Sequence, residues 1–307
     1  MTNAMRQSKL FTKTRKEAPA DETSKNAELL IRAGFIHKEM AGVYTYLPLG
    51  LRVLKKIENI IRKEMDKVGG QEVLMSSFQP KENWEKTGRW EAMTDLYKVS
   101  DSSEREVALG PTHEEIVVPI FKNYISSYKD FPVALYQIQN KFRMELRAKS
   151  GMLRGREFIM KDMYSFHTSQ EDFENFYNKM KDVYKTIFDK VGIGHLTYLT
   201  FASGGTFSKY SHEFQTITSA GEDTIYVDED SGVAINKEVF NDEVLSQLNL
   251  TKEKLVEHKA IEVGNIFDLK TKYSAPFDLS FTDEKGEKYP VLMGCYGIGL
   301  GRLMGTV

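Results

Sequence analysis

One basic block of the sequence carries the residue types that bind a polyphosphate. Within residues 141–158, Arg143 and Glu145 are two residues apart, so on a strand their side chains would lie on the same side. Four more cations flank or fill the turn that follows: Arg147, Lys149, Arg154 and Arg156. Guanidinium groups bind phosphate oxygens in bidentate pairs. From the spacing alone, a polyphosphate site and a solvated hairpin with surface charges are equally good interpretations.

A second block, near the end of the sequence, alternates glycine with other residues. Residues 294–302 read Gly-Cys-Tyr-Gly-Ile-Gly-Leu-Gly-Arg, and glycines at this spacing let a backbone approach a ligand closely. The signal is weak, because a helix–helix contact or a phosphate loop has a similar composition. The block lacks the Gly-Lys-Ser/Thr of a P-loop and the glycine order of a dinucleotide-binding site.

Two further segments place a carboxylate beside hydroxyl groups, an arrangement suited to holding an ammonium group. They are residues 110–115 (Gly-Pro-Thr-His-Glu-Glu) and residues 204–214 (Gly-Gly-Thr-Phe-Ser-Lys-Tyr-Ser-His-Glu-Phe). Taken singly, each segment is better explained as a helix-capping box or a turn. Their significance lies in their occurrence together with the two blocks above.

The elements that must position these residues are predicted from periodicity. Apolar residues at helical spacing predict helices over 26–33, 51–68, 114–124 and 173–191, and a short helical insertion over 241–258. Strands are predicted over 71–75, 107–109, 135–146, 157–166, 214–218, 224–227 and 289–293. Because the strands do not follow βαβ order, we expect an α+β fold around an antiparallel sheet flanked by helices.

Composition limits the class of protein. The chain has 307 residues, with 41% hydrophobic and 28% charged residues, which is typical of a folded globular protein. Because the formal net charge is only -2, binding of nucleic acid would need a local basic patch. The single cysteine, Cys295, excludes an intrachain disulfide and disfavours a thiolate metal site. The sequence has no secretory signal and no apolar run of membrane-spanning length, so the cytoplasm is the expected location.

Taken together, the blocks resemble the class II aminoacyl-tRNA synthetases. Phe142-Arg-x-Glu145 with Arg154-x-x-x-Phe158 resembles their motif 2, residues 297–302 resemble motif 3, and the helix 51–68 with the strand 72–75 resembles motif 1. Shorter stretches look like the bacterial-type prolyl-tRNA synthetases in particular: 110–115, 156–162, 164–167, 211–214 and 293–299. The resemblance implies the class II catalytic fold.

The resemblance also implies a reaction, in which ATP and Mg²⁺ support the activation of L-proline to prolyl-adenylate and its transfer to tRNA(Pro). Arg143, Arg154 and Arg302 would be the catalytic cations. The residues implied in ATP binding are Arg143, Glu145, Arg154, Phe158, Ser203, Thr206, Gly299 and Arg302. Those implied in proline binding are Thr112, Glu114, Met160, His212, Glu213 and Cys295. Arg147 and Lys149 would contact the acceptor end of the tRNA, and the metal ligands are left unassigned.

A domain organisation follows from the same resemblance. Residues 1–307 would form one catalytic domain, with motif 1 at about 50–80, motif 2 at about 141–162 and motif 3 at about 294–303. Motif 1 implies a homodimer. Bacterial-type members usually carry an editing domain, and its place is taken here by the short insertion at about 241–258. We expect the anticodon-binding domain of the family to be absent from this chain, which ends at Val307.

Two alternatives remain open on the sequence. A synthetase-like paralogue could activate an amino acid for an acceptor other than tRNA; the missing anticodon-binding domain favours this, whereas Arg147 and Lys149 oppose it. A non-catalytic regulatory module on the same fold would be expected to lose the ATP-binding arginines, but Arg143, Arg154 and Arg302 are all present.

The short insertion leads to a prediction about accuracy. A pocket of the size of proline cannot firmly exclude alanine, because a missing methylene is worth only ~1–3 kcal/mol. We therefore expect this chain to form alanyl errors that it does not clear itself. The measurement is the deacylation of mischarged alanyl-tRNA(Pro) by the purified chain, and rapid hydrolysis would contradict the expectation.

Overall fold

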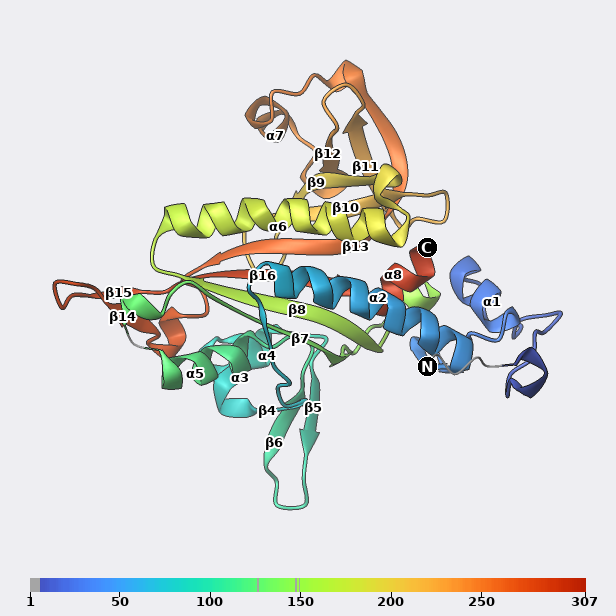
Figure 1. Cartoon of the computed structure of the whole chain (residues 1–307), viewed down its shortest axis with the longest axis horizontal. Helices are drawn as coiled ribbons and strands as arrows, with labels where there is room; N and C mark the ends of the chain where they lie inside the picture. The colour runs from blue at the N-terminus through green and yellow to red at the C-terminus, as the bar shows by residue number, and fades with distance from the viewer. Residues whose placement is uncertain (1–5, 126, 147, 149) are drawn as a thin grey trace.

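The computed structural model describes residues 6–125, 127–146, 148 and 150–307. Its centre is a sheet of nine strands in the order β10-β9-β12-β11-β13-β16-β8-β7-β3 (Figure 1). In chain order these strands are β3 (Gln71–Glu72), β7 (Val133–Phe142), β8 (Glu157–His167), β9 (Thr197–Ser203), β10 (Tyr210–Ile217), β11 (Asp223–Asp228), β12 (Val233–Asn236), β13 (Leu255–Lys270) and β16 (Leu292–Gly299). Neighbouring strands are antiparallel except β3 with β7 and β12 with β9.

Helices and smaller sheets surround this centre. The helices are α1 (Lys25–Arg32), α2 (Pro48–Lys67), α3 (Lys81–Lys86), α4 (Arg89–Ala92), α5 (Glu114–Tyr124), α6 (Gln170–Val191), α7 (Asp242–Gln247) and α8 (Leu300–Thr306). The remaining strands pair as β1 (Ile36–Met40) with β2 (Val43–Tyr46), as β14 (Ser280–Thr282) with β15 (Lys288–Pro290), and as β4 (Phe78–Pro80) and β5 (Tyr97–Ser100) on either side of β6 (Glu106–Leu109). The β5–β6 hairpin projects from the molecule (Figure 1).

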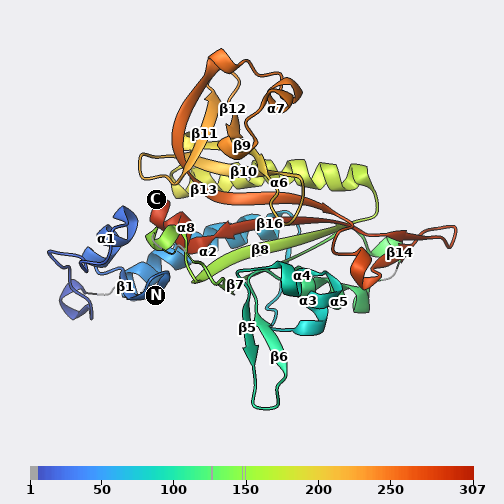
Figure 2. The ribbon, with the colours of Figure 1, turned by 180° about the vertical axis from the view of Figure 1, so that it is seen from behind.

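The two faces of the central sheet are covered differently. Helices α2 and α6 cover one face, where Ile61 and Met65 of α2 are buried in the same hydrophobic core as Tyr184 of α6 (Figure 1). On the other face, Phe121 of α5 stacks on Phe166 of β8 with ring centroids 3.8 Å apart. Figure 2 shows α3, α4 and α5 beside β7 and β8 on this side. The cavity described below lies on this second face, in the part that α5 does not cover.

Alternation along β8 assigns its residues to the two faces. Met163 lies in the core under α2 and α6, whereas Tyr164 lies in the core under α5. Because successive side chains of a strand point to opposite faces, Lys161 also points towards α6, where it donates to the Tyr184 hydroxyl. Asp162 points to the other face and lines the cavity.

Strand β13 links the large sheet to a smaller lobe (Figure 1). Its first half, from Leu255 to Ala260, pairs with β11, and its second half, from Ala260 to Ile266, pairs with β10. Since β9 pairs with both β10 and β12, strands β9 to β13 close on themselves. A small hydrophobic core fills this lobe: Phe201, Ile235, Val239, Val244 and Leu245.

Much of the predicted secondary structure is confirmed. The helices predicted over 26–33, 51–68, 114–124 and 173–191 correspond to α1, α2, α5 and α6, and the predicted hairpin strand 157–166 corresponds to β8. The strand predicted over 135–146 corresponds to β7 but ends at Phe142, so Arg143 and Glu145 lie in the loop that follows and not on a strand. The α+β fold around a largely antiparallel sheet is confirmed as well. The long strand β13 and strands β9 and β12 had not been predicted.

Three local predictions are wrong. The strand predicted over 71–75 is only Gln71–Glu72. Val73 still donates its N–H to the Tyr136 carbonyl at 2.8 Å, but Met75 donates its N–H to a side chain, Oε1 of Gln137, at 3.0 Å. The helix predicted over 241–258 is only Asp242–Gln247, and from Leu255 onward the segment is strand β13. The strand predicted over 289–293 is split between β15 and β16.

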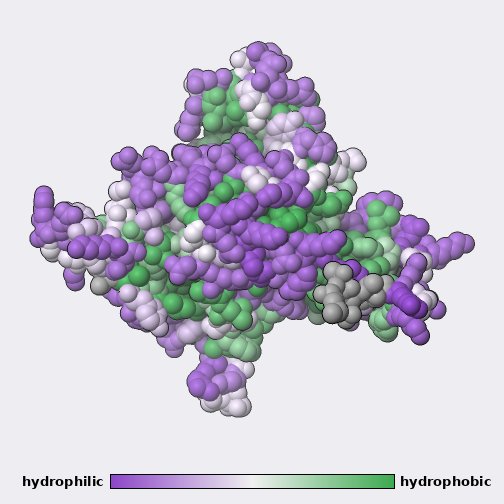
Figure 3. Space-filling model, viewed as in Figure 1, coloured by the Kyte–Doolittle hydropathy of each residue, from purple (hydrophilic) through white to green (hydrophobic). Residues whose placement is uncertain are grey.

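The surface agrees with this layered arrangement. Figure 3 shows the outward side of α2 and α6 as largely hydrophilic, since their apolar residues are turned to the sheet. Within the described ranges, no helix combines the length and the apolar character that crossing a membrane requires.

Candidate active site

A cavity of about 300 Å³ lies on the face of the sheet that is turned away from α2 and α6. Strands β8, β13 and β16 form its floor, and the loops after β7 and before β10 form its rim. Of the residues predicted for the site, it is lined by Thr112, Arg143, Glu145, Arg154, Phe158, Met160, Cys295, Gly299 and Arg302. The structure thus brings together predicted residues from three separate stretches of the sequence.

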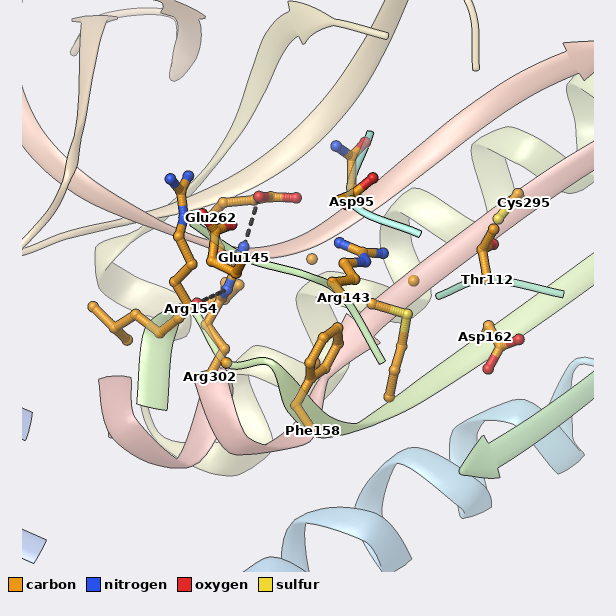
Figure 4. Close-up of a pocket in the computed structure, with 18 of the residues that line it drawn as sticks. Asp95, Thr112, Arg143, Glu145, Arg154, Phe158, Asp162, Glu262, Cys295 and Arg302 are labelled. Atoms are coloured by element: carbon orange, nitrogen blue, oxygen red, sulfur yellow. Dashed lines mark hydrogen bonds and ion pairs between the residues drawn. The ribbon is translucent and has the colours of Figure 1, made fainter. Parts of the chain in front are cut away.

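The cavity has two chemically different ends. Figure 4 shows Arg154 and Arg302 at one end and Thr112, Asp162 and Cys295 at the other, with Arg143 and Phe158 between them. The first end is cationic and the second holds buried acceptors. The same cavity can therefore take an anionic group and a cationic group side by side.

Arg143 follows β7 directly and stands over an aromatic ring. Its guanidinium carbon lies 5.3 Å from the centroid of the Phe158 ring, which is a cation–π distance. One terminal nitrogen donates to the Pro111 carbonyl at 3.3 Å, while Nε is buried without a hydrogen-bond partner among the described residues. Burial lowers the pKa of Arg143, so an anion in the cavity would be a favourable partner for this side chain.

Arg302 is held in place at the start of α8. Its Nε donates to the Leu153 carbonyl at 2.7 Å, and a terminal nitrogen donates to Oε2 of Glu262 at 2.7 Å. Burial works to lower the pKa of Arg302, but the Glu262 carboxylate outweighs it, so the pKa is raised. Arg154 is more exposed, and its Nε lies 3.8 Å from Oε2 of Glu145.

The glycines of β16 leave room beside these cations. A Cβ on Gly297 would meet the Met160 sulfur at 3.9 Å and the Asn265 carbonyl oxygen at 4.0 Å, and a Cβ on Gly299 the Arg302 Cβ at 3.5 Å, all at ordinary contact distance. The protein itself therefore does not require glycine at either position. Side chains there would instead occupy space that belongs to the cavity.

The opposite end is built on the first turn of α5. Glu114 is completely buried, and its Oε2 accepts a hydrogen bond from the Thr112 hydroxyl. Its other oxygen, Oε1, has no hydrogen-bond partner in the part of the chain that the structure describes. Burial raises the pKa of the neighbouring Cys295 thiol, and the Glu114 carboxylate raises it further. Cys295 is thus a neutral residue of the cavity wall.

The second carboxylate of this turn is fully paired. Glu115 accepts from Arg89 of α4 at 2.9 Å and 3.1 Å and from the Thr87 hydroxyl at 2.9 Å. The Arg89 guanidinium lies 3.7 Å from Oε2 of Glu114. Arg89 therefore lies against both carboxylates, whereas Oε1 of Glu114 has no hydrogen-bond partner among the described residues. Glu114 itself is completely buried behind Thr112 and is not among the residues that line the cavity.

Several predicted site residues do not line the cavity. His212 points to the α6 side of the sheet, where its Nδ1 lies 2.9 Å from the Tyr177 hydroxyl. It lines a separate cavity of about 580 Å³. Ser203 is the last residue of β9, and Thr206 lies in the turn between β9 and β10, from which only Phe207 reaches the cavity. Arg147 and Lys149 lie outside the described residues.

Glu213 stands one residue behind the cavity wall. Its Oε1 lies 3.4 Å from the side-chain nitrogen of the lining residue Asn265. Its Oε2 accepts from Gln215 at 2.9 Å and from Asn236 at 3.1 Å. Burial raises the pKa of Glu213 to about 8, and the nearby Glu262 carboxylate adds to the shift.

Sequence reasoning missed several lining residues: Asp95, Asp162, Phe207, Glu262, Asn265 and Phe267. The position of Asp162 follows from period-two alternation with Phe158 and Met160 on β8. Glu262 and Asn265 could not be assigned, since strand β13 had not been predicted. Asp95 precedes β5 and is far in sequence from the motifs.

The raised pKa of Glu213 predicts a pH dependence of stability. A carboxyl whose folded pKa is raised favours folding most at low pH, and this contribution is lost as pH rises from 4.5, the ordinary pKa, to about 8. We compare the free energy of unfolding of Glu213→Gln with that of wild type. We expect this difference to shift in favour of the variant by at least about 1 kcal/mol between pH 5 and pH 8.5. The measurement is urea unfolding at both pH values. Glu238→Gln, an exposed control, should show no such difference; an equal effect of Glu213→Gln at both values would contradict the assignment.

Comparison with known proteins agrees with this geometry. Residues 97–307 match the family model "tRNA synthetase class II core domain (G, H, P, S and T)". The proline--tRNA ligase of Sulfurimonas denitrificans is 40% identical over 99% of this chain and 74% of the relative. That of Geobacillus thermodenitrificans is 46% identical over 84% of this chain, but the match spans only 45% of the relative's length.

Solved structures show the same fold at low sequence identity. Giardia lamblia prolyl-tRNA synthetase in complex with prolyl-adenylate has a TM-score of 0.72 and 18% identity, covering 90% of this chain and 50% of that one. The Cryptosporidium parvum prolyl-tRNA synthetase complexed with L-proline and AMP has a TM-score of 0.70 and 15% identity, covering 92% of this chain and 50% of that one. With the family match and the 40% identity over nearly its whole length, the chain belongs to the class II aminoacyl-tRNA synthetases, within the proline--tRNA ligase family.

Proposed function

We propose that this chain activates L-proline with ATP and transfers the prolyl group to tRNA(Pro) in the cytoplasm. The observation that carries the proposal is the pairing of two sites in one cavity. Arg154 and Arg302 stand at one end, and Arg143 and the Phe158 ring lie in the middle. The other end reaches Thr112, next to the buried Glu114, whose Oε1 has no hydrogen-bond partner among the described residues. An amino acid and a nucleotide that must react together need such a pair of neighbouring sites.

The arginine end would bind ATP. Arg143 would hold the α-phosphate and Arg154 the outer phosphates, because guanidinium forks match phosphate oxygens. Phe158 and Arg302 would enclose the adenine, with the backbone beside Gly299 leaving room for it. In the structure the Phe158 ring is stacked by Arg143, so adenine binding would require Arg143 to turn towards the phosphate. Glu145 would orient the adenine or the acceptor end of the tRNA.

The carboxylate end would bind proline. The ring nitrogen of proline is a cation with two N–H donors, and Oε1 of Glu114 offers a buried, unpaired acceptor for one of them. The hydroxyl oxygen of Thr112 would accept or share the second N–H of the proline ring nitrogen. A buried charge is stable only when an opposite charge lies against it, so the site selects a cationic amine. Met160 and Cys295 would form the apolar walls around the ring.

The reaction needs no side-chain nucleophile. An oxygen of the proline carboxylate forms a bond to the α-phosphorus, the bond from that phosphorus to the bridging oxygen breaks, and pyrophosphate leaves with the electron pair. Arg143, Arg154 and Arg302 would neutralise the charge that develops on the phosphates. A hydroxyl of the terminal ribose of the tRNA then attacks the prolyl carbonyl, and AMP leaves. Arg147 and Lys149 would contact the acceptor end.

Mg²⁺ would be held mainly by the nucleotide. No group of three or more His, Cys, Asp or Glu side chains with metal-site geometry occurs among the residues described. Mg²⁺ in nucleotide sites is usually bound by one or two carboxylates together with phosphates and waters, and Glu262 in the cavity wall fits that role. The ion would supply charge neutralisation at the phosphates.

The alternatives differ in the acceptor and in catalysis. A paralogue with another acceptor would keep the whole cavity and differ only in the second step. A non-catalytic module would not need the open oxygen of Glu114 or the unpaired Nε of Arg143. The cavity therefore favours an enzyme over a regulatory module, while the acceptor is decided by experiment.

Proline-dependent exchange of pyrophosphate into ATP tests the first step. We expect exchange with wild type, and a loss of roughly a hundredfold or more in kcat/KM for Arg143→Ala, because one electrostatic donor at the transition state is worth that much. Arg105→Ala is the matched control, since this arginine lies at the exposed tip of the β5–β6 hairpin. If wild type catalyses no pyrophosphate exchange, the proposal that the chain is an enzyme is contradicted. Exchange without charging of tRNA(Pro) would favour a different acceptor.

We propose that two copies of the chain form a homodimer through motif 1. Strand β3 is at the edge of the central sheet, and Leu74 and Phe78 just beyond it are 78% and 61% exposed. An exposed apolar edge of this kind is usually covered by a partner. Light scattering after size exclusion should give a dimer for wild type and a monomer for Leu74→Asp, and a monomeric wild type would contradict the proposal.

A further inference from the structure

Behind the Glu114 end of the cavity, a group of polar side chains is buried that the reaction does not use directly. Its members are at most 2% exposed: His113, Gln137, Lys141, Asp162 and Tyr164. Polar groups are stable in such a position only when they are hydrogen-bonded to one another. The direction of those bonds can be worked out from the chemistry of each side chain.

Lys141 of β7 anchors the group. Its Nζ lies 2.8 Å from Oδ1 of Asp162 and 2.7 Å from Nδ1 of His113. Because an ammonium group only donates, Nδ1 of His113 accepts, and Nε2–H is left to donate to the Ser76 carbonyl at 3.1 Å. Burial, helped by the Lys141 charge, lowers the pKa of His113 to about 4, which agrees with a neutral ring. The ring is therefore held at both nitrogens.

Tyr164 of β8 extends the group to the backbone of α5. Its hydroxyl donates to Oδ2 of Asp162 at 2.9 Å, where Gln137 also donates at 3.0 Å. Since the hydroxyl proton is committed to the carboxylate, the hydroxyl oxygen is free to accept the backbone N–H of His113 at 2.9 Å. The same oxygen lies 3.5 Å from the Thr112 hydroxyl.

These bonds fix the residue that separates the two proposed proline ligands. His113 stands between Thr112 and Glu114 in the sequence and is the N-cap of α5. Its ring and its backbone N–H are both held by the buried group, so the direction in which Glu114 presents Oε1 depends on that group. The charge of Lys141 also matters, because it compensates Asp162, which lines the same cavity as Thr112.

We infer that Lys141, Asp162 and Tyr164 are positioning residues that set the affinity of the enzyme for proline, acting through His113 on Thr112 and Glu114. This inference rests on the proposed function, since it assumes that proline binds at Glu114. None of the hydrogen bonds described for the buried group involves Arg143, Arg154 or Arg302. Its described link to these cations is the like charge of Arg143, which adds to burial in lowering the pKa of Lys141. Its loss should therefore weaken proline binding and spare ATP binding.

The opposite face of the sheet offers a matched control. Lys161, the neighbour of Asp162 on β8, donates to the Tyr184 hydroxyl at 2.6 Å, and Tyr184 of α6 is as completely buried as Tyr164. Tyr164→Phe and Tyr184→Phe thus each remove one buried hydroxyl that belongs to a group containing a buried lysine. Only the first of these hydroxyls lies on the cavity side.

The experiment is pyrophosphate exchange with proline and ATP varied separately. Tyr164→Phe leaves the His113 N–H without a partner, so we expect KM for proline to rise roughly ten- to hundredfold and KM for ATP to stay within about twofold. Tyr184→Phe should leave both values within about twofold, even if its melting temperature falls. Asp162→Asn, which keeps the shape of the side chain, should raise KM for proline as well. The effects of Asp162→Asn and Tyr164→Phe should be less than additive, because both act in one group.

Each other outcome decides against the inference. An unchanged KM for proline in Tyr164→Phe, or an equal rise in both KM values, would show that the group is only structural. The same conclusion follows if Tyr184→Phe matches Tyr164→Phe. If circular dichroism shows that Tyr164→Phe does not fold, Asp162→Asn is judged by the same criteria. A wild type without exchange would overturn the proposed function and this inference with it.

Discussion

Charged side chains can be buried in a cavity wall only when an opposite charge lies against each of them. In this fold the pairs join elements that are distant in the chain: Arg89 with Glu115, Lys141 with Asp162, and Arg302 with Glu262. Within the described part of the chain, some buried polar atoms outside these pairs remain without a hydrogen-bond partner. Among the described residues, Oε1 of Glu114 has no hydrogen-bond donor, and Nε of Arg143 has no hydrogen-bond acceptor. The wall is therefore completed by a ligand that brings a cation to one end and an anion to the other, as an amino acid with a nucleotide does.

The alternation of side chains along the central strands allows one sheet to serve both packing and chemistry. On β8, Met163 packs under α2 and α6, while Asp162 and Tyr164 belong to the cavity side. On β16, Tyr296 is buried in the core and Cys295 lines the cavity. A strand buried on both faces cannot shift its register by one residue without exchanging the two sets. The geometry of the site is thereby tied to the packing of the long helices.

Local patterns in the sequence were sufficient for the long elements, because α2, α5 and α6 carry apolar residues at helical spacing. The sequence was less informative where tertiary contacts decide. Strand β13 escaped prediction because its first half is polar and exposed, and it is ordered by pairing with β11.

The residues of the candidate site could likewise be predicted from the sequence only in part. Its arginines and Glu114 were identified by resemblance and by their motifs, whereas the bonds of Lys141 to His113 and Asp162 join positions that no spacing rule connects. His212 could have been set apart from the cavity on sequence grounds, since on one strand it cannot face the same side as Glu213.

The central claim is that Glu114 and the three arginines hold the two reactants in one cavity. A crystal structure with a non-hydrolysable prolyl-adenylate analogue tests it most directly. We expect the ring nitrogen of the prolyl group to donate to Oε1 of Glu114, with the adenine against Phe158 and the linking group beside Arg143. A ring nitrogen bound elsewhere, with Oε1 of Glu114 still without a partner, would contradict it.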